Sequence, residues 1–204
     1  MNGTLTAVWC LGAMLLAAAA SAGETPAAGE KPLKGKKAVF VIAPTKYRDE
    51  ELKEPMAILQ ARGCAVTVAS STLKPVKGMR GRVAKPTVLL AEVKAEDYDA
   101  IVFVGGSGAK VYFDDATAHA LAKAGVAKGK LVAAICIAPC ILARAGVLKG
   151  KTATAYGWLN RRTLRKHGAR TVKDDVVRDG KIITANGPEA AKRFGQFLAQ
   201  SLAE

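Results

Sequence analysis

Cys136 lies where the sequence changes from the pattern of a buried strand to the pattern of a helix. Residues 131–135 before it form an apolar run, typical of a strand buried on both faces of a parallel sheet. Pro139 suits the first turn of a helix, and Ile141 and Leu142 continue with helical spacing. This pattern predicts a nucleophile elbow whose thiol lies near a helix N-terminus, which would lower the pKa of the thiol. The alternative is that Cys136 is a small buried hydrophobe, the usual role of a free cysteine.

Strand and helix patterns alternate along the chain on both sides of this elbow. Apolar runs predict buried strands at 37–43, 65–69, 100–104 and 131–135. Helices are predicted at 49–62, 114–128, 158–167 and 188–202, and short β segments at 151–156, 170–172, 176–178 and 181–184. This order predicts a single doubly wound α/β domain, in which helices sandwich a mostly parallel sheet.

Three local features qualify this outline. Residues 74–94 are less regular and favour a short hairpin or an extended excursion. Pro55 must lie in the first turn of its helix or bend it, so that helix is expected to begin nearer Lys53. The turn at Asp179 and Gly180 is expected to join the last two β segments as a hairpin.

Several segments that could form a site are expected at the same edge of the sheet. In doubly wound sheets, sites form beyond the carboxyl ends of the strands. Cys136, the pair Gly105 and Gly106, and the loop at residues 44–51 all follow predicted strands. Glycines directly after a strand allow close backbone approach and can expose N–H groups to an anion.

The chain is strongly basic, with 31 Lys and Arg residues against 17 Asp and Glu residues and a formal charge of +14. A basic balance can indicate nucleic acid, an anionic membrane surface or acidic substrates as partners. Here the basic residues are dispersed along the chain, and no aromatic residues interleave with them as in proteins that bind single strands. We therefore expect a solvated basic surface and no specific nucleic-acid partner.

The N-terminal segment predicts export. Residues 1–22 carry no charged side chain and end in a small-x-small motif, as in a cleaved signal peptide. The apolar run is short for a membrane span, so no stable insertion is expected after cleavage; a retained anchor is the alternative. Residues 23–36 are expected to form a flexible leader and residues 37–204 the domain, in a periplasmic or secreted protein.

Cleavage would leave Cys64, Cys136 and Cys140, an odd number that argues for at least one free thiol. Cys136 and Cys140 are about one helical turn apart, which lies beyond disulfide reach unless the turn distorts. No spacing typical of a metal site, a Walker motif or a dinucleotide-binding motif is present, so neither a metal nor a cofactor is expected.

Several segments together resemble the ThiJ/PfpI family, which includes the parkinsonism-associated deglycase and the intracellular protease-I-like proteins. The resemblance extends from about residue 37 to the C-terminus, and its most specific piece is the elbow at 133–136 followed by Pro139. The other matching pieces are residues 49–55, 96–106, 145–150 and 179–188.

This resemblance implies a flavodoxin-like sandwich in which Cys136 is the reactive centre. It also implies that Glu51, by its spacing to Pro55, is a protonated carboxyl beside the sulfur; the alternative is a solvated acid at a helix start. Gly105 and Gly106, with the amide of Ile137, would form the anion pocket. The family commonly forms dimers or hexamers, so a homo-oligomer is expected.

The sequence departs from the family pattern at two positions. Family members regarded as proteases have a histidine directly after the elbow cysteine, where this chain has Ile137. Other members have a histidine on the strand after the elbow helix, where Tyr156 stands. His119 and His167 match neither position and are expected to be ordinary surface residues. A Cys–His peptidase mechanism therefore lacks its base.

Two functions remain open at this point. The first is cofactor-free chemistry on small reactive carbonyls, like that of a glyoxalase or deglycase, in which Cys136 attacks an aldehyde and Glu51 moves the proton. The second is a redox-sensing or chaperone-like stress protein in which the same thiol is oxidised.

Overall fold

The structure is a computed structural model that describes residue 1 and residues 31–204. The expected signal peptide beyond Met1, and the leader up to residue 30, lie outside the described residues. The residues just before Lys37, the expected start of the domain, already pack against the domain. Leu33 is buried, and its N–H donates to the carbonyl of Arg62 at 2.6 Å.

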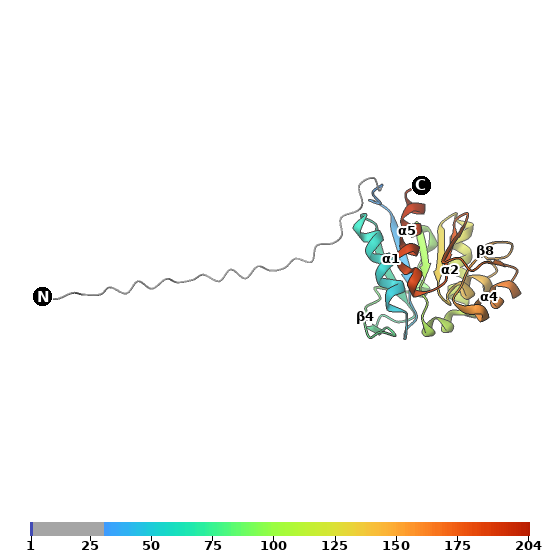
Figure 1. Cartoon of the computed structure of the whole chain (residues 1–204), viewed down its shortest axis with the longest axis horizontal. Helices are drawn as coiled ribbons and strands as arrows, with labels where there is room; N and C mark the ends of the chain where they lie inside the picture. The colour runs from blue at the N-terminus through green and yellow to red at the C-terminus, as the bar shows by residue number, and fades with distance from the viewer. Residues whose placement is uncertain (2–30) are drawn as a thin grey trace.

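A seven-stranded sheet forms the centre of the domain, in the order β10-β11-β7-β6-β1-β2-β5 (Figure 1). The strands are β1 (Lys37–Val41), β2 (Ala65–Ser70), β5 (Val88–Leu89), β6 (Ala100–Phe103), β7 (Leu131–Ile135), β10 (Val176–Asp179) and β11 (Ile182–Ala185). All neighbouring pairs are parallel except β10 and β11, which form the hairpin predicted at Asp179 and Gly180. The predicted flavodoxin-like, doubly wound fold is confirmed.

Helices cover both faces of this sheet and enclose two aliphatic cores. Helices α1 (Asp49–Ala61) and α5 (Ala191–Leu202) pack against each other on one face, as Figure 1 shows. Helices α2 (Ala116–Ala127), α3 (Pro139–Arg144) and α4 (Gly157–Lys166) contribute to the core on the other face. In β1, Phe40 faces the first core and Val39 the second, which is the alternation that a strand buried on both sides requires.

The start of α1 differs from the prediction. The helix begins at Asp49, so Pro55 lies well inside it and not in its first turn. Three acidic residues in the first turn favour this start, because carboxylates interact well with the positive end of a helix. Pro55 packs closely on α5, where a side chain at Gly195 would lie 2.7 Å from the Pro55 Cα.

Two small sheets lie outside the central one. Strands β3 (Val76–Lys77) and β4 (Val83–Ala84) form an antiparallel hairpin within the less regular segment, as expected. Strands β8 (Thr152–Ala153) and β9 (Arg170–Thr171) pair in parallel. The strand predicted at residues 151–156 is thus only two residues long, because the chain turns back toward Cys136 at Tyr156.

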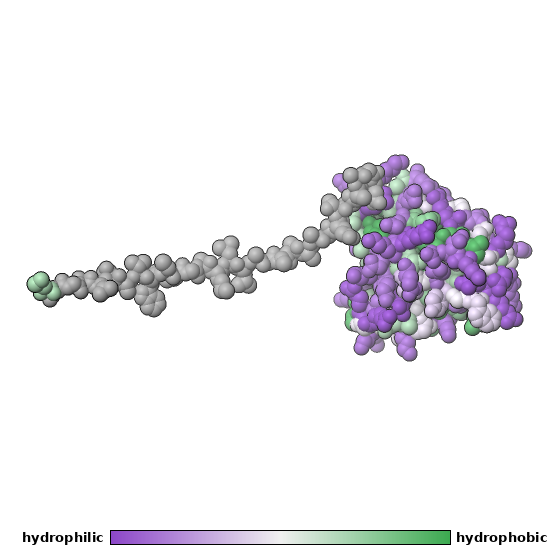
Figure 2. All heavy atoms as spheres, in the orientation of Figure 1, coloured by the Kyte–Doolittle hydropathy of each residue, from purple (hydrophilic) through white to green (hydrophobic). Residues whose placement is uncertain are grey.

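The face of the molecule shown in Figure 2 is mainly hydrophilic, with smaller apolar areas between charged side chains. No helix in the described part of the chain is long and apolar enough to cross a membrane. Among the same residues, no group of three potential metal ligands occurs.

Candidate active site

Cys136 occupies the turn between β7 and α3 in a left-handed backbone conformation, with φ of 65°. A non-glycine residue adopts this conformation only where its surroundings impose it. The N–H of Cys136 donates to the carbonyl of Ala185 at 2.9 Å, and its carbonyl accepts from the N–H of Tyr156 at 2.8 Å. The side chain is 8% exposed on the α1 side of the sheet. The predicted elbow is present, and two neighbouring segments hold it.

Glu51 approaches the same point from the first turn of α1 and is fully buried. It lies four residues before Pro55 and eight before Leu59, so all three side chains share the buried face of the helix. Its Oε2 accepts the N–H of Gly105 at 3.0 Å. The carboxyl also interacts with the Cys136 thiol, and its Oε1 is buried without a partner of good hydrogen-bond geometry. The fold thus brings together the two residues expected to carry the chemistry.

Burial raises the pKa of Glu51 to about 8, because the apolar surroundings disfavour the charged carboxylate. Hydrogen bonds from the Cys136 thiol and from the Gly105 N–H, together with the charge of Arg48, offset only part of this effect. Glu51 therefore keeps its proton near neutral pH and can exchange it with a group beside it. A solvated acid at the helix start, the alternative considered above, does not fit a fully buried side chain.

The expectation of a lowered pKa for Cys136 is wrong. Burial raises the pKa of the thiol to about 12, and a charged Glu51 adds to the increase. The backbone N–H groups of Gly106 and Ile137 hydrogen-bond to the sulfur and lower the pKa, but by less. Helix α3 begins three residues later, at Pro139, so its positive end does not outweigh desolvation. Because the thiol and the carboxyl interact strongly, their protons are released as those of a coupled pair.

Gly105, after β6, has no side chain, and this leaves room for Glu51 and Cys136 to come into contact. A side chain at Gly105 would lie 2.5 Å from Glu51 Oε2 and 2.6 Å from Cys136 Cβ. The role of Gly105 differs from the expected one, since its N–H is engaged by Glu51 and is not free for an oxyanion. The amides of Gly106 and Ile137, which already point at the sulfur, remain as donors for a negative oxygen formed there.

We expect Gly106→Ala to destabilise the protein by about 1–3 kcal/mol more than Gly146→Ala. Both glycines have positive φ, 94° and 82°, so alanine is strained at either position; Gly106 also has ψ of 160°, a combination open essentially to glycine alone, which adds to the expected loss there. A side chain at Gly106 would lie 2.4 Å from the backbone nitrogen of Arg48, whereas nothing lies within 4 Å at Gly146. Urea unfolding of both variants measures the difference. Equal losses would contradict the close approach described at Gly106.

The other cysteines do not join the site. Cys64, Cys136 and Cys140 are all free and buried. Cys140 lies on α3, and its thiol is 3.4 Å from the side-chain oxygen of Asn160 on α4. The regular start of α3 at Pro139 shows no distortion that would bring Cys140 to Cys136.

Neither histidine reaches the elbow. The ring of His119 lies 2.8 Å from the carbonyl of Phe113, and the ring of His167 lies 3.0 Å from the carbonyl of Thr163. Tyr156 does adjoin the site, through its backbone hydrogen bond to Cys136, and its side chain is exposed. Glu51 is therefore the only acid–base group that the described structure places against the thiol.

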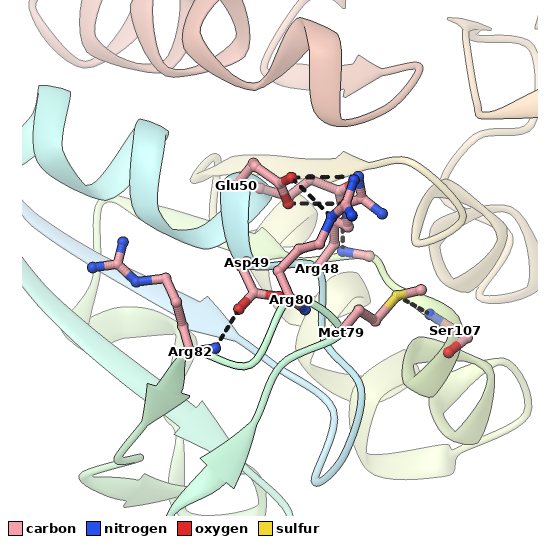
Figure 3. Close-up of polar contacts among 9 residues, drawn as sticks. Arg48, Asp49, Glu50, Met79, Arg80, Arg82 and Ser107 are labelled. Atoms are coloured by element: carbon pink, nitrogen blue, oxygen red, sulfur yellow. Dashed lines mark hydrogen bonds and ion pairs between the residues drawn. The ribbon is translucent and has the colours of Figure 1, made fainter.

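Sequence reasoning missed a clamp that holds the tip of the β3–β4 hairpin against α1 (Figure 3). The buried Asp49 accepts the backbone N–H groups of Arg80 at 2.7 Å and Arg82 at 2.8 Å. The N–H of Met79 donates to the carbonyl of Tyr47 at 2.9 Å. In the sequence, Asp49 is one of three consecutive acidic residues. Only the folded structure shows that Asp49 binds the hairpin, whereas Glu51 lies beside Cys136.

The fold and this centre define a class: flavodoxin-like α/β proteins with a cysteine at the elbow and a buried carboxyl beside it. The sequence pattern of the DJ-1/PfpI family matches residues 36–201, and the chain belongs to that family.

Individual relatives are similar over most of the domain. An uncharacterised protein of Methanocaldococcus jannaschii is 43% identical over 172 residues, which cover 83% of this chain and 84% of the relative. Glutathione-independent glyoxalase DJR-1.2 of Caenorhabditis elegans is 28% identical over 167 residues, covering 82% and 89%. The crystal structure of a ThiJ/PfpI domain protein from Brachyspira murdochii has a TM-score of 0.79 at 30% identity and covers 84% of this chain and 97% of that one.

Proposed function

We propose that this protein converts small 2-oxoaldehydes to 2-hydroxy acids without glutathione or another cofactor, using Cys136 and Glu51. The observation that carries this proposal is the contact between a buried thiol and a carboxyl whose pKa is raised to about 8. A general acid–base group works best when its pKa lies near the working pH. Support also comes from the family, because one relative is named a glutathione-independent glyoxalase.

In the first step, the sulfur of Cys136 attacks the aldehyde carbon and forms a thiohemiacetal. Because the thiol itself resists ionisation, its proton leaves as the carbon–sulfur bond forms, with the Glu51 carboxylate as the acceptor. The aldehyde oxygen gains the electron pair of the broken π bond. The N–H groups of Gly106 and Ile137 stabilise this negative oxygen until Glu51 returns the proton to it.

In the second step, the Glu51 carboxylate removes the proton that remains on the former aldehyde carbon, and the electron pair of that bond forms an enediolate with the neighbouring carbonyl. Glu51 then delivers this proton to the neighbouring carbon, while the hydroxyl proton of the thiohemiacetal passes to the neighbouring oxygen, so that the first carbon becomes the thioester carbonyl. This isomerisation turns the thiohemiacetal into a thioester of the 2-hydroxy acid, with no net oxidation. Water then cleaves the thioester, which releases the acid and restores the thiol. One carboxyl that alternates between acid and base is sufficient for every proton transfer, as expected for a site without histidine.

A deglycase-like reaction, in which the carbonyl compound arrives as an adduct on another molecule, would use the same first steps. The redox-sensing or chaperone-like alternative is less well supported by the geometry. Oxidation of a cysteine is favoured by a thiolate, and burial raises the pKa of Cys136, whereas the attack on an aldehyde needs no pre-formed thiolate because Glu51 takes the proton as the bond forms. A peptidase is disfavoured because Ile137 provides no base after the cysteine.

The proposal is tested by incubating the purified protein with 2-oxopropanal in the absence of thiols and chelatable metals. NMR of the mixture is expected to show lactate as the product at a rate proportional to protein concentration. Loss of 2-oxopropanal without lactate would mean adduct formation on the protein surface and would exclude this reaction.

We expect kcat/KM for 2-oxopropanal to increase with pH and to level off above about pH 8. The reason is that the coupled pair must lose one proton before Glu51 can accept the proton of the thiol, and the pKa of Glu51 is raised to about 8. Initial rates in a series of buffers measure the profile. A rate that falls between about pH 6 and 9 would show that this pair does not control the reaction.

A further inference from the structure

A cavity of about 700 Å³ lies beyond the glycines of the candidate active site, and Ser107, the residue after Gly106, is part of its lining. It lies between the loop after β1, the β3–β4 hairpin and the start of the 3-10 helix Ser107–Tyr112. Two lysines, Lys46 and Lys77, contribute to its lining, which contains no acidic residue. The volume is in the range of pockets that hold much larger ligands than 2-oxopropanal, so the smallest 2-oxoaldehyde would leave most of it unfilled.

The carboxylates close to this cavity are already engaged. Asp49 accepts two backbone N–H groups of the hairpin loop. Glu50 forms ion pairs with Arg48 at 2.9 Å and with Arg80 at 3.7 Å, as Figure 3 shows. In contrast, neither Lys46 nor Lys77 forms an ion pair with any carboxylate in the described part of the chain. The cavity therefore has an uncompensated positive charge.

The backbone fixes Lys46 at this position. It has a left-handed conformation with φ of 51°, which is unfavourable for a residue with a side chain. Its N–H donates to the carbonyl of Lys77, and its carbonyl accepts the N–H of Gly108, both at 3.1 Å. These bonds connect the two lysine positions to each other and to the glycine segment of the active site.

The cavity begins one residue beyond the oxyanion donors. Ser107, which lines it, follows Gly106, whose N–H hydrogen-bonds to the Cys136 sulfur. The N–H of Ser107 donates to the sulfur of Met79 at 3.4 Å, which joins the hairpin to this end of the site (Figure 3). A substrate bound at Cys136 could thus extend past Gly106 toward the lysines.

We infer that the cavity binds the anionic end of the substrate, and that the preferred substrates are 2-oxoaldehydes with a carboxylate on the carbon chain. The inference rests on the proposed function, since the aldehyde reacts at Cys136 while Lys46 and Lys77 pair with the carboxylate. A carboxylate also forms stronger hydrogen bonds with ammonium groups than neutral groups do, so the lysines discriminate against uncharged chains.

The charge of the site is tested without turnover by alkylating Cys136 with iodoacetate and with iodoacetamide, which differ in charge but hardly in size. Peptide mass spectrometry gives the two rates for Cys136. We expect the iodoacetate-to-iodoacetamide rate ratio to fall roughly tenfold in the double variant Lys46→Gln/Lys77→Gln. The control Lys123→Gln/Lys166→Gln removes the same charge from exposed positions on α2 and α4 and should leave the ratio unchanged. Equal ratios in both double variants would overturn the inference.

Turnover then compares 4,5-dioxopentanoate with 2-oxopentanal, which have the same chain length and differ in the carboxylate. We expect KM for the anionic compound to rise roughly tenfold in Lys46→Gln/Lys77→Gln, with kcat/KM for the neutral compound unchanged. Equal use of both compounds by the wild type and the variant would contradict the inference and leave the proposed function intact. A lysine-dependent alkylation ratio without turnover of either compound would support the anion subsite and contradict the proposed function.

Discussion

Replacing Cys136 with serine is expected to reduce lactate formation from 2-oxopropanal by at least about a thousandfold. The hydroxyl is a much weaker acid than the thiol, so a carboxyl with a pKa of about 8 cannot remove its proton. Serine differs from cysteine by one atom and can still hydrogen-bond to Glu51, so the fold should persist. The initial rate under saturating 2-oxopropanal, with circular dichroism as a check of folding, measures the effect.

Cys64→Ser and Cys140→Ser are matched controls, because both thiols are free and buried but lie away from the elbow. Each control should retain activity within about threefold of the wild type when corrected for folded protein. If Cys136→Ser keeps more than about a tenth of the wild-type rate, the sulfur is not the attacking atom.

The variant Glu51→Gln is expected to lose activity by about 10²–10⁴-fold and, at pH 8, to become more stable than the wild type. Glutamine preserves the shape of the side chain and can still accept the N–H of Gly105, but it cannot carry a proton between sulfur and substrate. Loss of function combined with a gain in stability is the signature of a buried acid retained for chemistry.

The sign of the stability effect follows from the raised pKa. Below pH 4.5, Glu51 is protonated in the folded and the unfolded protein, so it adds no pH dependence to the free energy of unfolding. Between 4.5 and about 8, the unfolded chain releases the proton while the folded protein keeps it, so stability falls as pH increases. Above about pH 8 the full penalty applies, at most about 5 kcal/mol for a shift of this size.

Thermal unfolding at pH 5 and at pH 8 measures this dependence. The midpoint of Glu51→Gln should exceed that of the wild type by more at pH 8 than at pH 5. Glu54→Gln removes another carboxylate of α1, one that pairs with Lys53 at the surface and does not act on Glu51, and should not show this increase. A Glu51→Gln difference that is equal at both pH values would contradict the raised pKa.

The sequence was sufficient to predict the elbow and the sheet around it. Residues 131–135 are apolar throughout because β7 is buried on both faces. Pro139 marks the helix start because an N–H at the first helical position would have no partner within the helix, so proline loses no hydrogen bond there. The role of Glu51 followed from the family resemblance, whereas Gly105 and Gly106 were already indicated by their place directly after a predicted strand. The spacing of four residues between Glu51, Pro55 and Leu59, which form the buried face of α1, is a second sequence signal that could have indicated a buried Glu51.

Other features depend on contacts that no local pattern encodes. The prediction for α1 gave Pro55 too much weight, because the first-turn acids and the packing on α5 decide where the helix begins. The pKa of Cys136 was predicted in the wrong direction because its burial depends on helices distant in the sequence. The cavity between Lys46 and Lys77 depends on the contacts that Asp49 and the loop after β1 make with the β3–β4 hairpin.

The central claim is that the Cys136 sulfur carries the substrate during turnover. Acid quenching during steady-state conversion of 2-oxopropanal, followed by peptide mass spectrometry, tests it most directly, because the thiohemiacetal and the thioester both add the mass of one substrate molecule. We expect that mass on the Cys136 peptide while substrate remains, and its disappearance once the substrate is consumed. Continued lactate formation with an unmodified Cys136 peptide at every time point would contradict the claim.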